Sequence, residues 1–189
     1  MKKTIAALLG LMTLPALADW QLVSEDSSLN FTTFKKEHVA ENHTFESFNA
    51  TIADDGKVML SIDLASVNTN IAIRDQRMQE HLFATTLFPN ATFAASISPK
   101  ILNNLKQGEI KTQLLKGEIA LHGNTQSVEL SVNVSRLSKD KILVTSAAPL
   151  LVKAKDFDLV KGINQLQKLA GLPSISHTVP VTFTLSFTQ

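Results

Sequence analysis

The sequence contains no cysteine. Disulfide bonds and thiol catalysis are therefore excluded, and an exported form would depend on its hydrophobic core for stability. The chain also contains no Gly-x-Ser-x-Gly motif and no glycine-rich phosphate loop. Serine hydrolysis and nucleotide chemistry consequently gain no support from the sequence, and we expect no catalytic residue and no cofactor.

The chain also lacks an excess of one charge, because its 18 lysine and arginine residues are nearly balanced by 17 aspartate and glutamate residues. With no basic block, the sequence gives no indication of nucleic-acid binding. No apolar run reaches the length of about 20 residues that a membrane-spanning helix requires. We therefore expect a partner other than nucleic acid and no stable insertion into a membrane.

The N-terminus has the features of a secretory signal peptide. Two lysines precede a short apolar run at residues 5–14, and an Ala-x-Ala tripeptide ends at Ala18. We predict that residues 1–18 are a signal peptide cleaved after Ala18 and that the protein is exported to the periplasm. A buried N-terminal helix is the alternative. The mature chain, residues 19–189, would be one domain of 171 residues with a net charge of −1.

Apolar and polar residues alternate along much of the mature chain, most regularly at residues 179–187, 58–64 and 128–134. Such alternation predicts β-strands with one buried face. Phe45 and Phe48, three residues apart, fit no single strand face and predict a bulge or twist between them. We count about eight strands, mostly antiparallel, which would form either a barrel able to hold a small ligand or a sandwich.

Two segments have helical spacing instead. Met78 and Leu82 predict a short helix that carries Arg74 and Arg77, and apolar residues between positions 159 and 170 predict a second one. The two arginines could both face an anion such as a pyrophosphate. In the alternative interpretation, Arg74 bonds to local carboxylates or backbone carbonyls. The residues alone favour that alternative.

Ten phenylalanines, no tyrosine and one tryptophan make an aromatic set with almost no polar groups. Such rings suit a dry core or a tunnel for a hydrocarbon chain, and composition alone favours the core. The five histidines have no metal-binding spacing. His38 and His43 could approach each other across a bend, but we expect both to be solvated loop residues and predict no metal site.

Several motifs follow one another through the mature chain: Val67-Asn68-Thr69, Arg74-Asp75, Phe88-Pro89-x-Ala91-x-Phe93, Gly117–Thr125 and Lys155-Asp156-Phe157. In this order the sequence resembles the YceI-like family of secreted polyisoprenoid-binding proteins. The resemblance implies an all-β fold, here with two short helices, in which an antiparallel lipocalin-like β-barrel of about eight strands encloses a long isoprenoid chain. It also implies that a homodimer can form.

We therefore expect a periplasmic binding or carrier protein, not an enzyme, that sequesters a polyisoprenoid or quinone-like lipid. The residues predicted to line the tunnel are Phe31, Leu60, Ile62, Phe93, Leu121, Phe183 and Leu185, with Arg74 and Arg77 as candidates for the head group. Two alternatives stay open: an accessory enzyme acting on a quinone-like substrate, and a ligand-free structural or stress-response protein. A continuous apolar tunnel would favour binding, whereas a filled interior would favour the structural alternative.

Overall fold

The computed structural model describes residues 19–189, so the predicted signal peptide lies outside the described residues. Twelve strands make up most of this part of the chain: β1 (Trp20–Leu22), β2 (Ser28–Lys35), β3 (Val39–Phe45), β4 (Phe48–Ile52), β5 (Lys57–Asp63), β6 (Val67–Asn68), β7 (Asn90–Ser96), β8 (Ile110–Leu121), β9 (Asn124–Arg136), β10 (Lys141–Ser146), β11 (Leu150–Lys153) and β12 (Thr178–Thr188). The helices are α1 (Ala72–Arg77), the π-helical turn η3 (Met78–Phe83) that continues it, α2 (Pro99–Asn104) and α3 (Val160–Leu169). Short 3-10 turns are η1 (Ser24–Asp26), η2 (Leu64–Ser66) and η4 (Ala154–Phe157).

Eight of the strands form a closed antiparallel ring. The order is β1-β4-β5-β7-β8-β9-β10-β12, and β12 pairs with β1 to close it. Closure leaves no exposed edge around the ring and gives each strand an inner and an outer face. The predicted all-β antiparallel barrel is confirmed, and the sandwich alternative is wrong.

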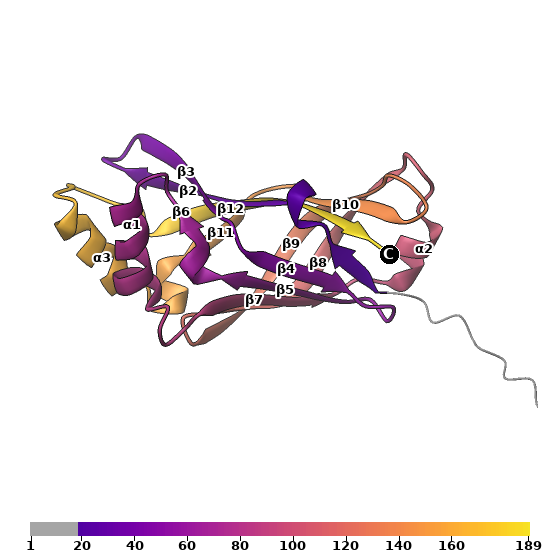
Figure 1. Ribbon diagram of the computed structural model, residues 1–189, viewed down its shortest axis with the longest axis horizontal. Helices are drawn as coiled ribbons and strands as arrows, with labels where there is room; N and C mark the ends of the chain where they lie inside the picture. The colour runs from indigo at the N-terminus through magenta and orange to yellow at the C-terminus, as the bar shows by residue number, and fades with distance from the viewer. Residues whose placement is uncertain (1–18) are drawn as a thin grey trace, which may run out of the picture.

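The barrel is elongated, and at several places around it two strands follow one another along its long axis (Figure 1). The C-terminal part of β12 pairs with β10 and β1, whereas its N-terminal part pairs with β11 and β2. In the same way β3 pairs with β2, and β4, which follows it, pairs with β1. The irregularity predicted between Phe45 and Phe48 is the break between β3 and β4.

Helices lie at the two ends of the barrel: α1 and α3 at one end, and α2 at the other (Figure 1). The predicted helices are present as α1 with η3 and as α3, and Met78, Leu82 and Ile163 are buried as their spacing requires. A further short helix, α2, adds to the two that the sequence predicted. Pro99 begins α2, where its missing N–H leaves no helical hydrogen bond unmade.

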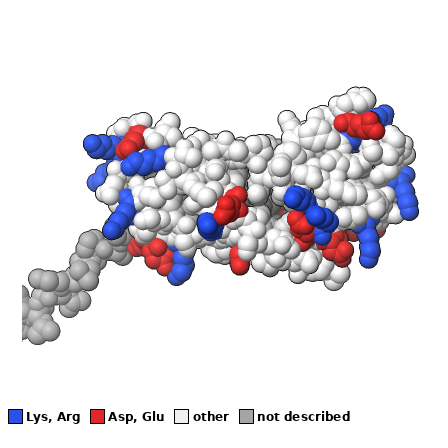
Figure 2. All heavy atoms as spheres, turned by 180° about the vertical axis from the view of Figure 1, so that it is seen from behind, with Lys and Arg blue, Asp and Glu red and all other residues white. Residues whose placement is uncertain are grey.

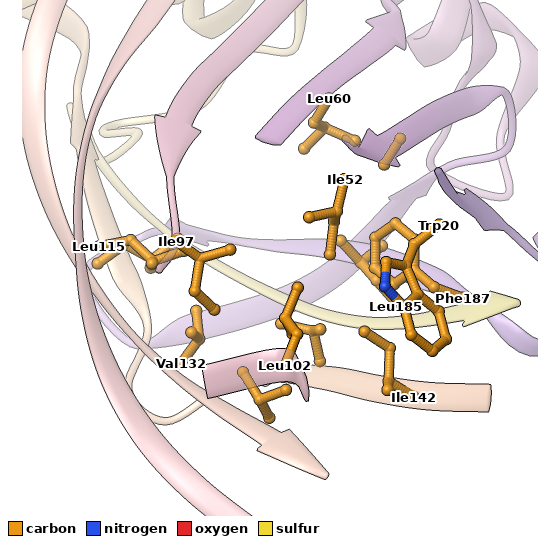
Figure 3. Packing of buried hydrophobic residues seen from close by; sticks show 14 of the residues in the cluster. Trp20, Ile52, Leu60, Ile97, Leu102, Leu115, Val132, Ile142, Leu185 and Phe187 are labelled. Carbon is orange, nitrogen blue, oxygen red and sulfur yellow. The ribbon is translucent and has the colours of Figure 1, made fainter. Parts of the chain in front are cut away.

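The end of the barrel near α2 is lined by buried apolar side chains. Trp20, Ile142, Leu185 and Phe187 gather between the strands (Figure 3), and all four are buried. Arg136 lies with its guanidinium 5.0 Å from the centre of the Trp20 ring and donates hydrogen bonds to backbone carbonyls in α2 and in the β9–β10 turn. These contacts close this end of the barrel.

On the face that Figure 2 shows, lysine and arginine side chains lie beside aspartate and glutamate side chains rather than in a patch of one sign. Within residues 19–189, no helix is both long enough and apolar enough to cross a bilayer.

Candidate functional site

The barrel encloses a cavity of about 460 Å³. Its wall includes residues near α2, such as Val134 and Phe187, and residues near α1 and α3, such as Leu82 and Ile163. The hollow therefore extends between the two apolar clusters of the protein instead of being filled by them. Ligand pockets commonly have volumes of roughly 300–1,000 Å³, so the space is large enough for a small molecule.

All nine residues predicted to contact a ligand line this cavity: Phe31, Leu60, Ile62, Phe93, Leu121, Phe183, Leu185, Arg74 and Arg77. Strand register explains the apolar part of the set. On β5 and β7, Leu60 lies opposite Phe93, and Ile62 lies opposite Ala91, so these side chains share the inner face. Their contact with a ligand stays a prediction.

The wall changes from apolar to charged along β2 and β3. From the interior toward the end with α1 and α3, the wall residues are Phe31, Thr33 and Lys35 on β2, and Phe45, His43 and Glu41 on β3. The register places Phe31 opposite His43 and Thr33 opposite Glu41. Diagonal side-chain contacts join Phe31 to Phe45, Thr33 to His43 and Lys35 to Glu41. An aromatic, a neutral polar and a charged level therefore follow one another along this part of the wall.

Glu41 is the centre of the charged level. Its carboxylate lies 2.8 Å from Lys35 Nζ and 2.8 Å from Arg74 Nη1. The hydrogen bond from Lys35, supported by the Arg74 guanidinium, holds the pKa of Glu41 below its ordinary value. Arg74 also donates from Nη2 to the Thr69 carbonyl at 3.1 Å. This geometry fits the interpretation in which Arg74 bonds to a carboxylate and a backbone carbonyl.

Arg77 is less constrained than Arg74. Its Nη1 donates a long hydrogen bond of 3.4 Å to the carbonyl of Leu169, which links α1 to the end of α3. Among the ion pairs of residues 19–189, none involves Arg77. Its charge therefore remains available to a ligand or to water at this end of the cavity.

His43 is a wall residue that the sequence interpretation missed. It was expected in a solvated loop, but it lies on β3 and is only 5 % exposed, so that expectation is wrong. Its Nε2 shares a hydrogen bond of 2.9 Å with Thr33 Oγ1, and its ring centre is 5.2 Å from that of Phe31. Burial, with a smaller effect of Arg74, lowers the pKa of His43, which keeps the ring neutral near pH 7. The alternation of Glu41, His43 and Phe45 was the available signal.

His38, in contrast, lies in the exposed turn between β2 and β3, as expected. Within the described part of the chain, no three histidine, aspartate or glutamate side chains come together in a way that could hold a metal ion. The two histidines therefore form no common site.

The comparisons with known proteins agree with this architecture. A solved polyisoprenoid-binding domain from Saccharophagus degradans, implicated in plant cell wall breakdown, is 38 % identical to this chain, with a TM-score of 0.87. The similarity covers 89 % of this chain and 97 % of that domain. No curated protein matches the sequence.

Two more distant structures share the fold. BcnA of Burkholderia cenocepacia is 17 % identical with a TM-score of 0.69, covering 87 % of this chain and 98 % of its own. The YCEI protein of Campylobacter jejuni is also 17 % identical, with a TM-score of 0.57, covering 78 % of this chain and 84 % of its own. The YceI-like domain model matches residues 20–187. With this match and with its closed, hollow barrel, the chain belongs to the YceI-like domain family.

Proposed function

We propose that this protein is a periplasmic carrier that sequesters a polyisoprenoid or a similar amphipathic lipid inside its barrel. The observation that carries the proposal is the apolar cavity of about 460 Å³ that extends between the two apolar clusters. The related domain from Saccharophagus degradans, described as polyisoprenoid-binding, supports the same class of ligand.

The driving force would be the transfer of a hydrocarbon chain from water to this cavity. Each buried methylene contributes about 0.8 kcal/mol, so ten methylenes contribute about 8 kcal/mol before the cost of ordering the ligand. Phe93, Leu60 and Phe183 offer the apolar wall for such a chain. The charged side chains around Glu41 stand in the wall near α1, while apolar side chains of α3, such as Ile163 and Leu166, continue the lining at the same end.

The cavity also bears on the two alternatives. A ligand-free structural protein would be more stable with a filled interior, because an unfilled cavity destabilises the protein in proportion to its volume. An accessory enzyme would need a positioned acid or base. His43 is buried in the wall, but the one side-chain hydrogen bond that it makes within residues 19–189 is to Thr33 rather than to a carboxylate that could orient it for proton transfer.

Export to the periplasm is proposed from residues 1–18, whose sequence has the pattern of a cleaved signal peptide. A quinone-like head group and a homodimer likewise stay predictions.

The test is lipid extraction from the mature protein purified in its native state, followed by mass spectrometry. We expect a prenyl lipid in an amount comparable to that of the protein. An unrelated periplasmic protein purified alongside identifies lipids that are merely carried over. The proposal is wrong if no such lipid is recovered and if protein unfolded, stripped of lipid and refolded binds no prenyl alcohol offered to it.

A further inference from the structure

The ionisable residues of the cavity wall gather toward the end with α1 and α3. Within residues 19–189 they are Lys35, Glu41, His43, Arg74 and Arg77, and the other wall residues are apolar apart from a few threonines and a serine. Burial lowers the pKa of His43, so its ring is neutral near pH 7. The remaining wall charges are three cations and one carboxylate, which leaves an excess of positive charge at this end of the cavity.

Arg77 carries part of this excess. Glu41 lies 2.8 Å from Lys35 Nζ and 2.8 Å from Arg74 Nη1, so its single negative charge is shared between these two cations. Arg77 makes no ion pair within residues 19–189, and its one hydrogen bond there is the long contact of 3.4 Å to the carbonyl of Leu169. Most N–H donors of its guanidinium therefore have no partner in this part of the chain.

The acidic residues that follow Arg74 along the chain do not compensate Arg77. The carboxylate of Asp75 accepts hydrogen bonds from the backbone N–H and the hydroxyl of Thr69. The carboxylate of Glu80 lies 3.9 Å from the Nε2 atom of the neighbouring histidine, and neither acid lines the cavity. Within residues 19–189, the negative charge that would balance Arg77 is missing, and a ligand can supply it.

The cavity reaches the surface beside Arg77. Ala170, which follows the last residue of α3, is exposed to solvent and also lines the cavity. Because Arg77 donates to the adjacent Leu169 carbonyl, the ends of α1 and α3 lie side by side at this opening (Figure 1). A charged head group at the opening would keep part of its hydration while its chain enters the apolar interior. Its desolvation therefore costs less than in a fully enclosed site.

We propose that the lipid held in the barrel has an oxyanionic head group, a carboxylate or a phosphate, which pairs with Arg77 at this opening. The proposal rests on the proposed function, because it assumes that a lipid occupies the cavity. The planar guanidinium can donate parallel hydrogen bonds to the oxygens of either group. An oxyanion offsets the positive excess of the wall, whereas an ammonium head group adds to it and an alcohol leaves it uncompensated.

The experiment titrates delipidated mature protein with ligands that share one prenyl chain and differ in the head group: a carboxylic acid, a monophosphate, an alcohol and an amine. At low ionic strength, wild-type protein should bind each anionic ligand about 10- to 100-fold more tightly than the alcohol, as expected for charge-assisted hydrogen bonds. The amine should bind most weakly. Added salt should reduce the preference for the anions, because it screens charges at a solvated opening. The tighter of the two anionic ligands identifies the preferred oxyanion.

Arg77→Met removes the charge and keeps an unbranched side chain. It should reduce the preference for the anions to about threefold or less and leave alcohol affinity within about twofold of the wild type. Arg77→Lys should retain part of the preference, because the charge stays but the planar donor pair is lost. Lys168→Met is the matched control: Lys168 is exposed in the last turn of α3 and does not line the cavity, so the same loss of charge should leave the preference within about twofold. Thermal unfolding of each variant shows whether it is folded.

The inference is overturned if wild-type protein binds the alcohol as tightly as the two anionic ligands, a comparison that needs no variant. It is also overturned if folded Arg77→Met keeps the wild-type preference. If Lys168→Met loses as much of the preference as Arg77→Met does, the overall charge of this end selects the ligand and a contact with Arg77 does not. If wild-type protein binds none of the four ligands, the proposed function itself is wrong.

Discussion

Replacing Ala91 with leucine should weaken binding of a hydrocarbon chain by narrowing the cavity. Ala91 lies on β7 opposite Ile62, is 6 % exposed and lines the cavity. Leucine adds three carbon atoms to the side chain on this inner face. They would exclude about three methylene groups of the ligand, each worth about 0.8 kcal/mol. The loss of about 2.4 kcal/mol corresponds to a dissociation constant raised by up to about 50-fold.

The stability of the empty protein should change in the other direction or stay the same. The added carbons enter a cavity, so they gain contacts instead of forcing a packed core apart, as long as the leucine finds a relaxed rotamer. Calorimetric titration with a prenyl alcohol measures the affinity, and thermal unfolding without ligand measures the stability. Opposite signs of the two effects distinguish a blocked cavity from a damaged fold.

Ala94→Leu is the control on the same strand. Ala94 is half-buried on β7, pairs with Met59 and Glu118, and does not line the cavity. The same addition of three carbons there should leave ligand affinity within about twofold of the wild type, because no ligand methylene is displaced. If Ala91→Leu remains folded and binds the alcohol as tightly as Ala94→Leu does, the chain does not occupy the cavity beside β7 and the reasoning fails.

Three further substitutions test how the barrel is held together. Gly117→Ala should destabilise the protein by about 1–3 kcal/mol in urea unfolding, because its Cβ would lie 2.5 Å from the carbonyl oxygen of Ala94; unchanged stability would contradict this close approach. Arg136→Met should lower the free energy of unfolding by about 1–3 kcal/mol, because two backbone carbonyls lose their donor and the Trp20 ring loses its cation. A variant as stable as the wild type would mean that the contacts closing this end are dispensable. Glu41→Gln should lower the free energy of unfolding by about 1 kcal/mol near pH 7. The pKa of Glu41 is lowered in the folded state, so the ionised carboxylate stabilises the fold at any pH above the unfolded-state pKa. The stability difference between Glu41→Gln and the wild type should therefore vanish as the pH falls through the folded-state pKa of Glu41. A stability difference that grows on acidification would contradict the ion pairs.

The strands and the inner face of the barrel could be predicted because alternation directly records which side of a strand is buried. This is why Leu60 and Phe93, distant in sequence, were both assigned to the interior and indeed lie opposite each other. Closure of the ring could not be derived in this way. It depends on pairing between β1 and β12, which no local pattern encodes, so the choice of a barrel over a sandwich rested on the family resemblance.

Three features could not be predicted from the sequence, each for a physical reason. The helix α2 begins at Pro99, and a proline after a strand is compatible with a loop as well as with a helix start. His43 was missed because a polar residue is usually solvated, and burial at this position depends on the cavity wall that Phe31 and Thr33 provide from β2. The volume of the cavity could not be predicted, because alternation indicates which residues face inward but not how much space their side chains leave.

The central claim is that a hydrocarbon chain lies inside the barrel. Its most direct test is a crystal structure of the mature protein loaded with a prenyl alcohol. We expect continuous density for the chain along the cavity, in contact with Leu60, Phe93 and Phe183. A lipid bound on the outer surface, with the interior filled by water or rearranged side chains, would contradict it.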